Sequence, residues 1–236
     1  MRSLIVMAMF VASLTHAAWT EHTEIRNLQL AADGITVFEV DAGAGSLTIK
    51  GLPDIQDITV KAMIRVPGKD ADSVKKIMAS DMTLVLDKVR DHARLEAAFD
   101  GRFWRHDQGS IDLEVAMPAG LALSVKDGSG SIDISDIAGF VTIDDGSGSI
   151  IVSNIGHLNI DDGSGSIEVS AATGDVSIED GSGGITVRQV GGDVIIDDGS
   201  GGIDVVDVEH DVIIVDDGSG SLSVSDIRGA VHKPKT

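Results

Sequence analysis

A four-residue motif, Asp-Gly-Ser-Gly, recurs six times in the second half of this 236-residue chain, and each copy leads into alternating apolar residues. Successive copies begin 18, 17, 18, 18 and 19 residues apart. So regular a period is typical of stacked structural units, each of which can bury its apolar face only against its neighbours. The copies of this DGSG motif begin at Asp127, Asp145, Asp162, Asp180, Asp198 and Asp217.

One unit contains two stretches of period-2 alternation, residues 131–135 and 140–144, which place alternate aliphatic side chains on one face. Between them lies a single apolar residue, Ile137, at a corner position. Stacked units would bury these faces by pairing each strand in parallel with its equivalent one coil away. The sequence therefore predicts an all-β fold, a parallel β-helix or β-roll solenoid with coils of about 18 residues spaced about 4.8 Å apart, and the crossover rule favours right-handed winding.

The glycines of the motif are expected to serve the turns. Gly128 and Gly130, with their equivalents, can adopt the positive φ angles that a sharp change of direction requires. The inward aliphatic residues of the later units follow the same scheme as those of the first.

Negative charge is concentrated in the repeats. The chain has 38 acidic and 18 basic residues, and residues 127–226 hold 21 of the acids but a single basic residue, Arg188. The net charge of −20 therefore belongs to the predicted solenoid, because the remaining residues are balanced. This argues against binding of nucleic acid or anionic lipid through the repeats.

Acidic residues recur in pairs at the start of each motif. Alternation predicts that Asp144 points outward, because Ile143 points inward, and that Asp145 turns toward the corner and caps the Gly-Ser-Gly turn. The alternative is a row of Ca²⁺ sites, since Ca²⁺ takes six to eight oxygen ligands. Calcium-binding nonapeptide rolls need an aspartate where this chain has Ile132, which weighs against that alternative. The candidate Ca²⁺ ligands are Asp144, Asp145, Asp161, Asp162, Asp197, Asp198, Asp216 and Asp217.

The first 18 residues have the pattern of a secretory signal peptide, with Arg2, an apolar segment and a small-residue cleavage region. The sequence has no cysteine and no later stretch that is long and apolar enough to span a membrane. We expect an exported protein of the periplasm, cell surface or medium. We divide the rest into an irregular β region (19–125) that continues into the solenoid, the regular repeats (126–231) and a basic tail (232–236) that would blunt the last edge.

In the irregular region, alternation predicts strands over 34–40, 46–50, 58–64, 82–86, 93–98, 111–117 and 121–126. A short helix is expected over 69–80, as a cap or side excursion. Residues 41–47 read as a decayed copy of the repeat motif. We expect this half to form irregular coils that cover one end of the solenoid.

A search for catalytic chemistry finds no zinc-type histidine pair, no cysteine and no nucleophile elbow. The repeated carboxylates are made equivalent by the repeat, whereas glycosidase chemistry needs two unequal ones. Phe103 and Trp104 stand out in the least repetitive polar segment. They are a candidate recognition loop for a sugar or peptide, or a hydrophobic plug of the cap.

The order of features resembles a bacterial envelope family of adhesin-like β-strand-repeat ("putative adhesin") proteins. The resemblance covers roughly residues 34–231 and is carried by the segments 41–49 and 111–118, which lead into the Gly-Ser-Gly-Ser-Ile units. It implies a β-helical exported protein and brings no catalytic residues.

Three functions remain open at this point. The leading one is a non-enzymatic, adhesin-like solenoid without a cofactor that presents an acidic surface to an envelope protein or polysaccharide. The second is a Ca²⁺-binding β-roll whose folding or ligand binding depends on the metal. The third is a polysaccharide-active enzyme, which would usually need basic residues near the cleavage site.

Overall fold

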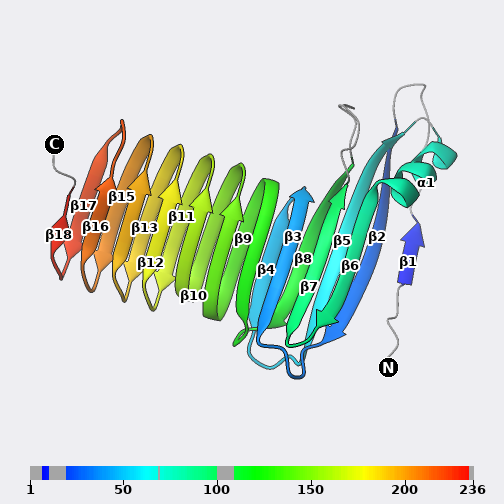
Figure 1. Ribbon diagram of the computed structural model, residues 1–236, viewed down its shortest axis with the longest axis horizontal. Helices are drawn as coiled ribbons and strands as arrows, with labels where there is room; N and C mark the ends of the chain where they lie inside the picture. Colours follow the sequence, from blue (N-terminus) through cyan, green and yellow to red (C-terminus); the bar gives the residue numbers. More distant parts are fainter. Residues whose placement is uncertain (1–6, 11–19, 69, 100–108, 234–236) are drawn as a thin grey trace.

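In the computed structural model, which describes residues 7–10, 20–68, 70–99 and 109–233, the repeats form a parallel β-solenoid. Each coil consists of two strand segments, and every segment pairs in parallel with the equivalent segment one coil away. Figure 1 shows these coils stacked along the long axis of the molecule. The strands are β9 (Ala122–Asp145), β10 (Gly148–Asp162), β11 (Gly165–Ala172), β12 (Val176–Asp180), β13 (Gly183–Val190), β14 (Val194–Asp198), β15 (Gly201–Val208), β16 (Val212–Asp216), β17 (Leu222–Ile227) and β18 (Val231–His232).

The register matches the sequence period residue for residue. Ile150 pairs with Ile132 on one side and with Ile167 on the other, so equivalent aliphatic side chains stack in columns. The predicted solenoid and its coil length are confirmed. Two intervals depart from 18 residues. Ile155 pairs with Ile137 but His157 pairs with Phe140, so β10 is one residue short at that corner. Ile196 pairs with Ile214 but Asp197 pairs with Asp216, so Val215 is an extra residue and is exposed.

The core lies between the two sheets of the solenoid. The inward residues of β9 to β16 and the corner residues from Ile137 to Val208 are buried, as the alternation predicted. In β17 the equivalent residues Leu222, Val224 and Ile227 are only partly buried, because no coil of the described chain lies beyond them.

Glycine is required at the DGSG corner for two different reasons. The last glycine of the motif, as in Gly148 and Gly165, has φ near +145° to +149°, a region that L side chains rarely adopt. The first glycine, as in Gly146, does not have a positive φ; there a Cβ atom would lie 2.6 Å from the carbonyl oxygen of Gly128 in the neighbouring coil. The expected positive φ is therefore wrong for the first glycine of the first five motifs, which is needed for close packing of the backbones, whereas in the sixth motif the first glycine, Gly218, has a φ of 47°.

At the opposite corner the left-handed residue is not a glycine. The residue before each corner aliphatic residue is left-handed, with φ between 53° and 62°. Polar side chains tolerate this conformation better than branched ones, and most of the positions carry one. These positions are Asp136, Asn154, Ala171, Gln189, Asp207 and Asp226.

The N-terminal region contains two further coils. Strands β3 (Val37–Ala44) and β4 (Leu47–Leu52) pair in parallel with β9 on one side and with β7 (His92–Phe99) and β8 (Ser110–Pro118) on the other. Ala42 pairs with Asp127 and Leu47 with Ile132, which confirms that residues 41–47 are a decayed copy of the repeat motif. This coil lies between two coils that both come later in the chain.

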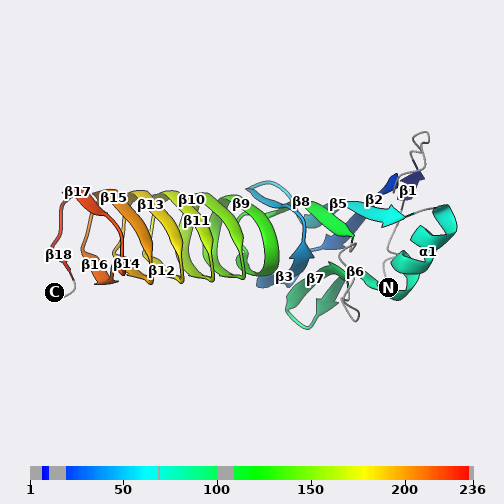
Figure 2. The ribbon, with the colours of Figure 1, turned by 90° about the horizontal axis from the view of Figure 1, so that it is seen from above.

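The remaining N-terminal strands are antiparallel, not coils, which corrects part of the expectation. Strand β5 (Asp57–Gly68) pairs with β2 (Thr20–Ala31) and with β8, and β6 (Met82–Val89) forms a hairpin with β7. Strand β2 was not predicted from the sequence; its side chains are mostly half-buried, so its alternation is weak. Figure 2 shows the change from the regular stack to this wider end, where the β6–β7 hairpin projects to one side.

The predicted helix is α1 (Ala71–Ser80), and it packs on β5 and β6 at the end of the stack opposite to the C-terminus (Figure 1). Asp70 caps its N-terminus by accepting a 2.8 Å hydrogen bond from the backbone N–H of Ser73. Val74 is its buried residue. Within the proposed signal segment, only β1 (Met7–Phe10) belongs to the described chain, and it pairs antiparallel with β2.

Candidate functional site

Strand alternation sorts the repeated acids onto two sides of the same sheet. The first acid of each pair points outward, and its equivalents pair in register from coil to coil. They form a row along the solenoid, exposed except for a half-buried Asp197. We call this the outer acidic row: Asp144, Asp161, Glu179, Asp197 and Asp216.

The second acid of each pair points inward and is at most 5 % exposed. In three coils one carboxylate oxygen accepts the backbone N–H two residues on: Ser164 donates to Asp162 over 3.2 Å, and the equivalent bonds to Asp180 and Asp198 are 3.0 Å long. The predicted turn cap is thus confirmed in these coils. We call the buried set the inner aspartate column: Asp127, Asp145, Asp162, Asp180 and Asp198.

Burial raises the pKa of every carboxyl group in the inner column. Desolvation is the main cause, and it raises the pKa of Asp127 to about 7 and that of Asp180 to about 6. Repulsion from neighbouring carboxylates adds to the effect. In Asp162, Asp180 and Asp198 the turn hydrogen bonds oppose it. These groups therefore hold protons at pH values at which exposed aspartates are ionised.

The candidate Ca²⁺ ligands are not brought together as pairs. Asp144 and Asp145 lie on opposite sides of their strand, and so do Asp161 and Asp162 and also Asp197 and Asp198. In the last coil Asp216 is exposed and Asp217 is half-buried, and Asp216 accepts the N–H of Gly218 over 2.9 Å. Within the ranges that the structure describes, no three His, Asp or Glu side chains converge as a metal site would need. Ca²⁺ binding stays a prediction.

A series of hydrogen bonds between adjacent coils lies at the corner just before the strands that carry the outer acidic row. We call it the corner ladder: His157, Asp175, Asp193 and Asp211. The ring nitrogen Nδ1 of His157 accepts the backbone N–H of Asp175 over 3.0 Å. Asp175 accepts the N–H of Asp193 in turn, and Asp193 that of Asp211, over 2.9 and 3.0 Å. These hydrogen bonds were not predicted from the sequence. A polar acceptor recurring every 18 residues just before an aliphatic strand was the signal that could have found it.

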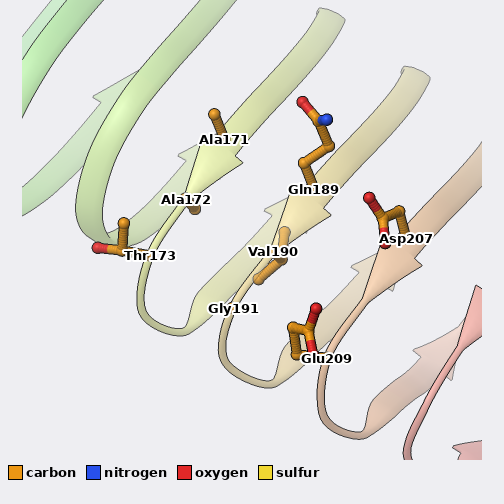
Figure 3. Close-up of a pocket in the computed structure, with 8 residues that line it drawn as sticks. All are labelled: Ala171, Ala172, Thr173, Gln189, Val190, Gly191, Asp207 and Glu209. Carbon is orange, nitrogen blue, oxygen red and sulfur yellow. The ribbon is translucent and has the colours of Figure 1, made fainter.

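A shallow pocket of about 450 Å³ lies at the left-handed corner. Ala171 and Ala172 lie at the positions that Asn154 and Ile155 occupy in the preceding coil, and the smaller alanine side chains leave this space open. Figure 3 shows Gln189, Asp207 and Glu209 around it on the two following coils. Glu209 is already paired with Arg228. The pocket is the place where the equivalence of the coils is visibly interrupted.

The other predicted features have mixed outcomes. The guanidinium group of Arg188 is 2.6 Å from the carboxylate of Asp204, so the single basic residue of the segment 127–226 is already paired. Phe103 and Trp104 lie outside the described residues. The described part of the chain includes no helix with the length and apolar character of a membrane span.

No family model and no curated protein matches this sequence. Among solved structures, the chain is similar to a putative cell adhesion protein from Clostridium sporogenes at 10 % identity and a TM-score of 0.33, over 92 % of this chain and 100 % of that one. It is also similar to putative adhesins from Parabacteroides distasonis (11 % identity, TM-score 0.31) and Parabacteroides merdae (10 % identity, TM-score 0.37). Each of these two alignments covers 89 % of this chain and 96 % of the other.

Proposed function

We propose that this protein is an exported, non-enzymatic, adhesin-like solenoid whose outer acidic row binds a cationic partner in the cell envelope. The observation that carries the proposal is the register of the row, in which one carboxylate per coil pairs with its equivalent in the next coil. The partner is then a protein segment or polysaccharide with positive charges spaced along an extended chain.

The electrostatics of the row support this function. Carboxylates about 4.8 Å apart repel each other by about 0.9 kcal/mol per pair in water. A cationic ligand lying along the row relieves several such repulsions at once. Lys126 already does so at one end, where its ammonium group is 3.2 Å from the carboxylate of Asp144.

Binding of a lysine-rich peptide, measured with increasing salt, tests the proposal. The variant Asp161→Asn/Glu179→Gln removes two charges from the outer acidic row. The control Asp133→Asn/Glu168→Gln removes the same two charges from the opposite sheet, where both residues are also exposed. We expect at least tenfold weaker binding for the first variant and a much smaller loss for the control. Equal losses, or binding that is independent of salt, would contradict the proposal.

A second candidate function is Ca²⁺ binding by the outer acidic row, favoured by the same register, because two adjacent exposed carboxylates can share one cation whose remaining oxygen ligands are water. Titration with millimolar Ca²⁺ followed by circular dichroism tests it. An unchanged melting temperature, together with unchanged peptide binding, would exclude it. A polysaccharide-active enzyme gains no support from the described residues, since Arg188 is engaged with Asp204.

A further inference from the structure

The inner aspartate column leaves five buried carboxyl groups with an oxygen that has no partner. Oδ2 of each of them lacks a hydrogen bond, and in Asp145 both oxygens do. The side chains are at most 5 % exposed, so water does not replace the missing partner. Buried polar groups of this kind are rare in folded proteins because each one costs its full desolvation energy. Five in a row call for a physical explanation.

No positive charge in the described chain faces the column. The nearest cation in sequence, Lys126, points outward to Asp144. The charged neighbours of the column are negative, and their repulsion raises the pKa of the column groups. They are Asp144, Asp161, Asp197, Asp216 and Asp217. The residues that flank the column inside the solenoid are aliphatic, such as Ile143 and Ile150. At the N-terminal end the column stops at Ala42 and Ala97, which pair with each other and contribute no charge.

The column is also continuous. Asp145 pairs with Asp162, Asp162 with Asp180 and Asp180 with Asp198, each at the same position of its coil. Equivalent carboxyl groups are therefore about 4.8 Å apart along the axis. A fully ionised column would place like charges at this spacing in a dry environment, where their repulsion is several-fold stronger than in water. The negative charge of the column must therefore be neutralised in the folded protein.

We propose that the inner aspartate column is a ladder of proton-bearing carboxyl groups, in which the hydroxyl of one aspartic acid is donated to the carboxyl of the next coil. A protonated carboxyl group gains one O–H donor and keeps an oxygen that can accept. The second oxygen of each aspartic acid can therefore form a hydrogen bond without water. A proton can lie between the carboxyl groups of two adjacent coils without a cavity. A Ca²⁺ ion would need six to eight oxygen ligands, and the column offers only two carboxyl groups between adjacent coils. The raised pKa of all five groups agrees with this assignment.

The ladder makes the stacking of the coils proton-linked. When the column loses its protons, each gap changes from a hydrogen bond to a repulsion between buried charges. The contribution of the column to stability is then expected to be complete below the unfolded pKa of 3.8 and to be lost as the pH rises through the folded pKa values, about 6 for Asp180 and about 7 for Asp127. This property needs no partner bound to the outer acidic row, whose carboxylates only add to the repulsion on the column.

Asparagine substitution in the full chain tests the ladder, because asparagine has the shape of aspartic acid, is neutral and supplies its own donor. The variant Asp162→Asn/Asp180→Asn changes two adjacent rungs, and Asp161→Asn/Glu179→Gln removes the same charges from the outer row as a control. Urea unfolding midpoints would be measured at pH 5 and pH 8, with EDTA and with Ca²⁺. We expect the wild type and the control to have lower midpoints at pH 8 than at pH 5. The inner variant should have a smaller difference, because two of the five column groups no longer titrate, and should exceed the wild type at pH 8.

Two outcomes would overturn the proposal. One is an inner variant that is less stable than the wild type at pH 8. The other is a wild type whose midpoint at pH 8 falls with EDTA and recovers with Ca²⁺, which would show that a metal ion neutralises the column. Should the variant fail to fold, infrared spectroscopy of the wild type at pH 6.5 decides. The carbonyl stretch of a neutral carboxylic acid is expected in the folded protein and should vanish on unfolding; its absence from the folded protein would refute the ladder.

Discussion

Gly148 and Gly165 pack backbone against backbone in adjacent coils, and the carbonyl oxygen of Gly148 occupies the place that a Cβ atom on Gly165 would need. The φ angle of Gly165 is +149°, so any other residue there would also strain its own backbone. The last glycine of the DGSG motif therefore carries two constraints at once.

We expect Gly165→Ala to lower the free energy of unfolding by at least about 3 kcal/mol, because strain and a steric clash add. Gly184→Ser is the matched control: it restores the serine of other coils, and the only atom within 4 Å of its Cβ position is a carbonyl oxygen at 4.0 Å. Urea denaturation measures both. A near-neutral Gly165→Ala would show that the coils can separate at this corner.

Two adjacent isoleucines test which face of strand β14 points into the core. Ile196 is fully buried, whereas Ile195 is 39 % exposed on the outer face. Ile196→Ala should cost about 2–5 kcal/mol through lost burial and a cavity, and Ile195→Ala should cost less than about 1 kcal/mol. Thermal and urea unfolding of the two variants check this, and similar costs would mean that the strand faces are assigned wrongly.

The pH dependence of stability has a definite sign. An aspartate whose pKa is raised on folding contributes its full stability below its unfolded value of 3.8, and this contribution is lost as the pH rises through the folded value, about 7 for Asp127. Between these values each such group changes stability by up to about 1.4 kcal/mol per pH unit. We expect the wild type to lose stability relative to Asp127→Asn from pH 4 to pH 7. Urea midpoints at half-unit pH steps measure the difference, and a difference that grows in favour of the wild type would reverse the assignment.

The corner ladder depends on an acceptor at residue 157. His157→Ala removes the acceptor for the N–H of Asp175 and should destabilise the protein by about 0.5–1.5 kcal/mol. His157→Asn keeps a side-chain oxygen, as the aspartates of the later coils do, and should recover most of the loss. Hydrogen exchange of the Asp175 amide provides a local readout. Equal exchange in the wild type and His157→Ala would show that the bond contributes nothing.

The repeats could be predicted from the sequence because period and alternation together decide which residues face inward. Ile132, Ile160 and Val187 are buried as expected, and their partners one coil away follow from counting residues. The turn role of Asp162 and Asp180 was also predictable, since an aspartate before Gly-Ser-Gly can reach the N–H two residues on.

The rest could not be predicted, for physical reasons that differ by region. Strand β2 is polar and half-buried, so alternation gives little signal there. The antiparallel pairing of β5 with β2 and β8 depends on long-range contacts that no local pattern records. The depth of burial of Asp198 follows from stacking on both sides, which is a property of the assembled coils and not of one unit.

The position of residues 37–52 between two later coils sets an order of assembly. When the chain is made from its N-terminus, this segment exists before either neighbour, and it must wait for residues 92–118 and 122–135 before both of its edges are covered. Each later coil needs only the one before it, so the rod can lengthen one turn at a time. Duplication or loss of whole units during evolution is therefore tolerated among the repeats, whereas the interleaved end admits no such change in number.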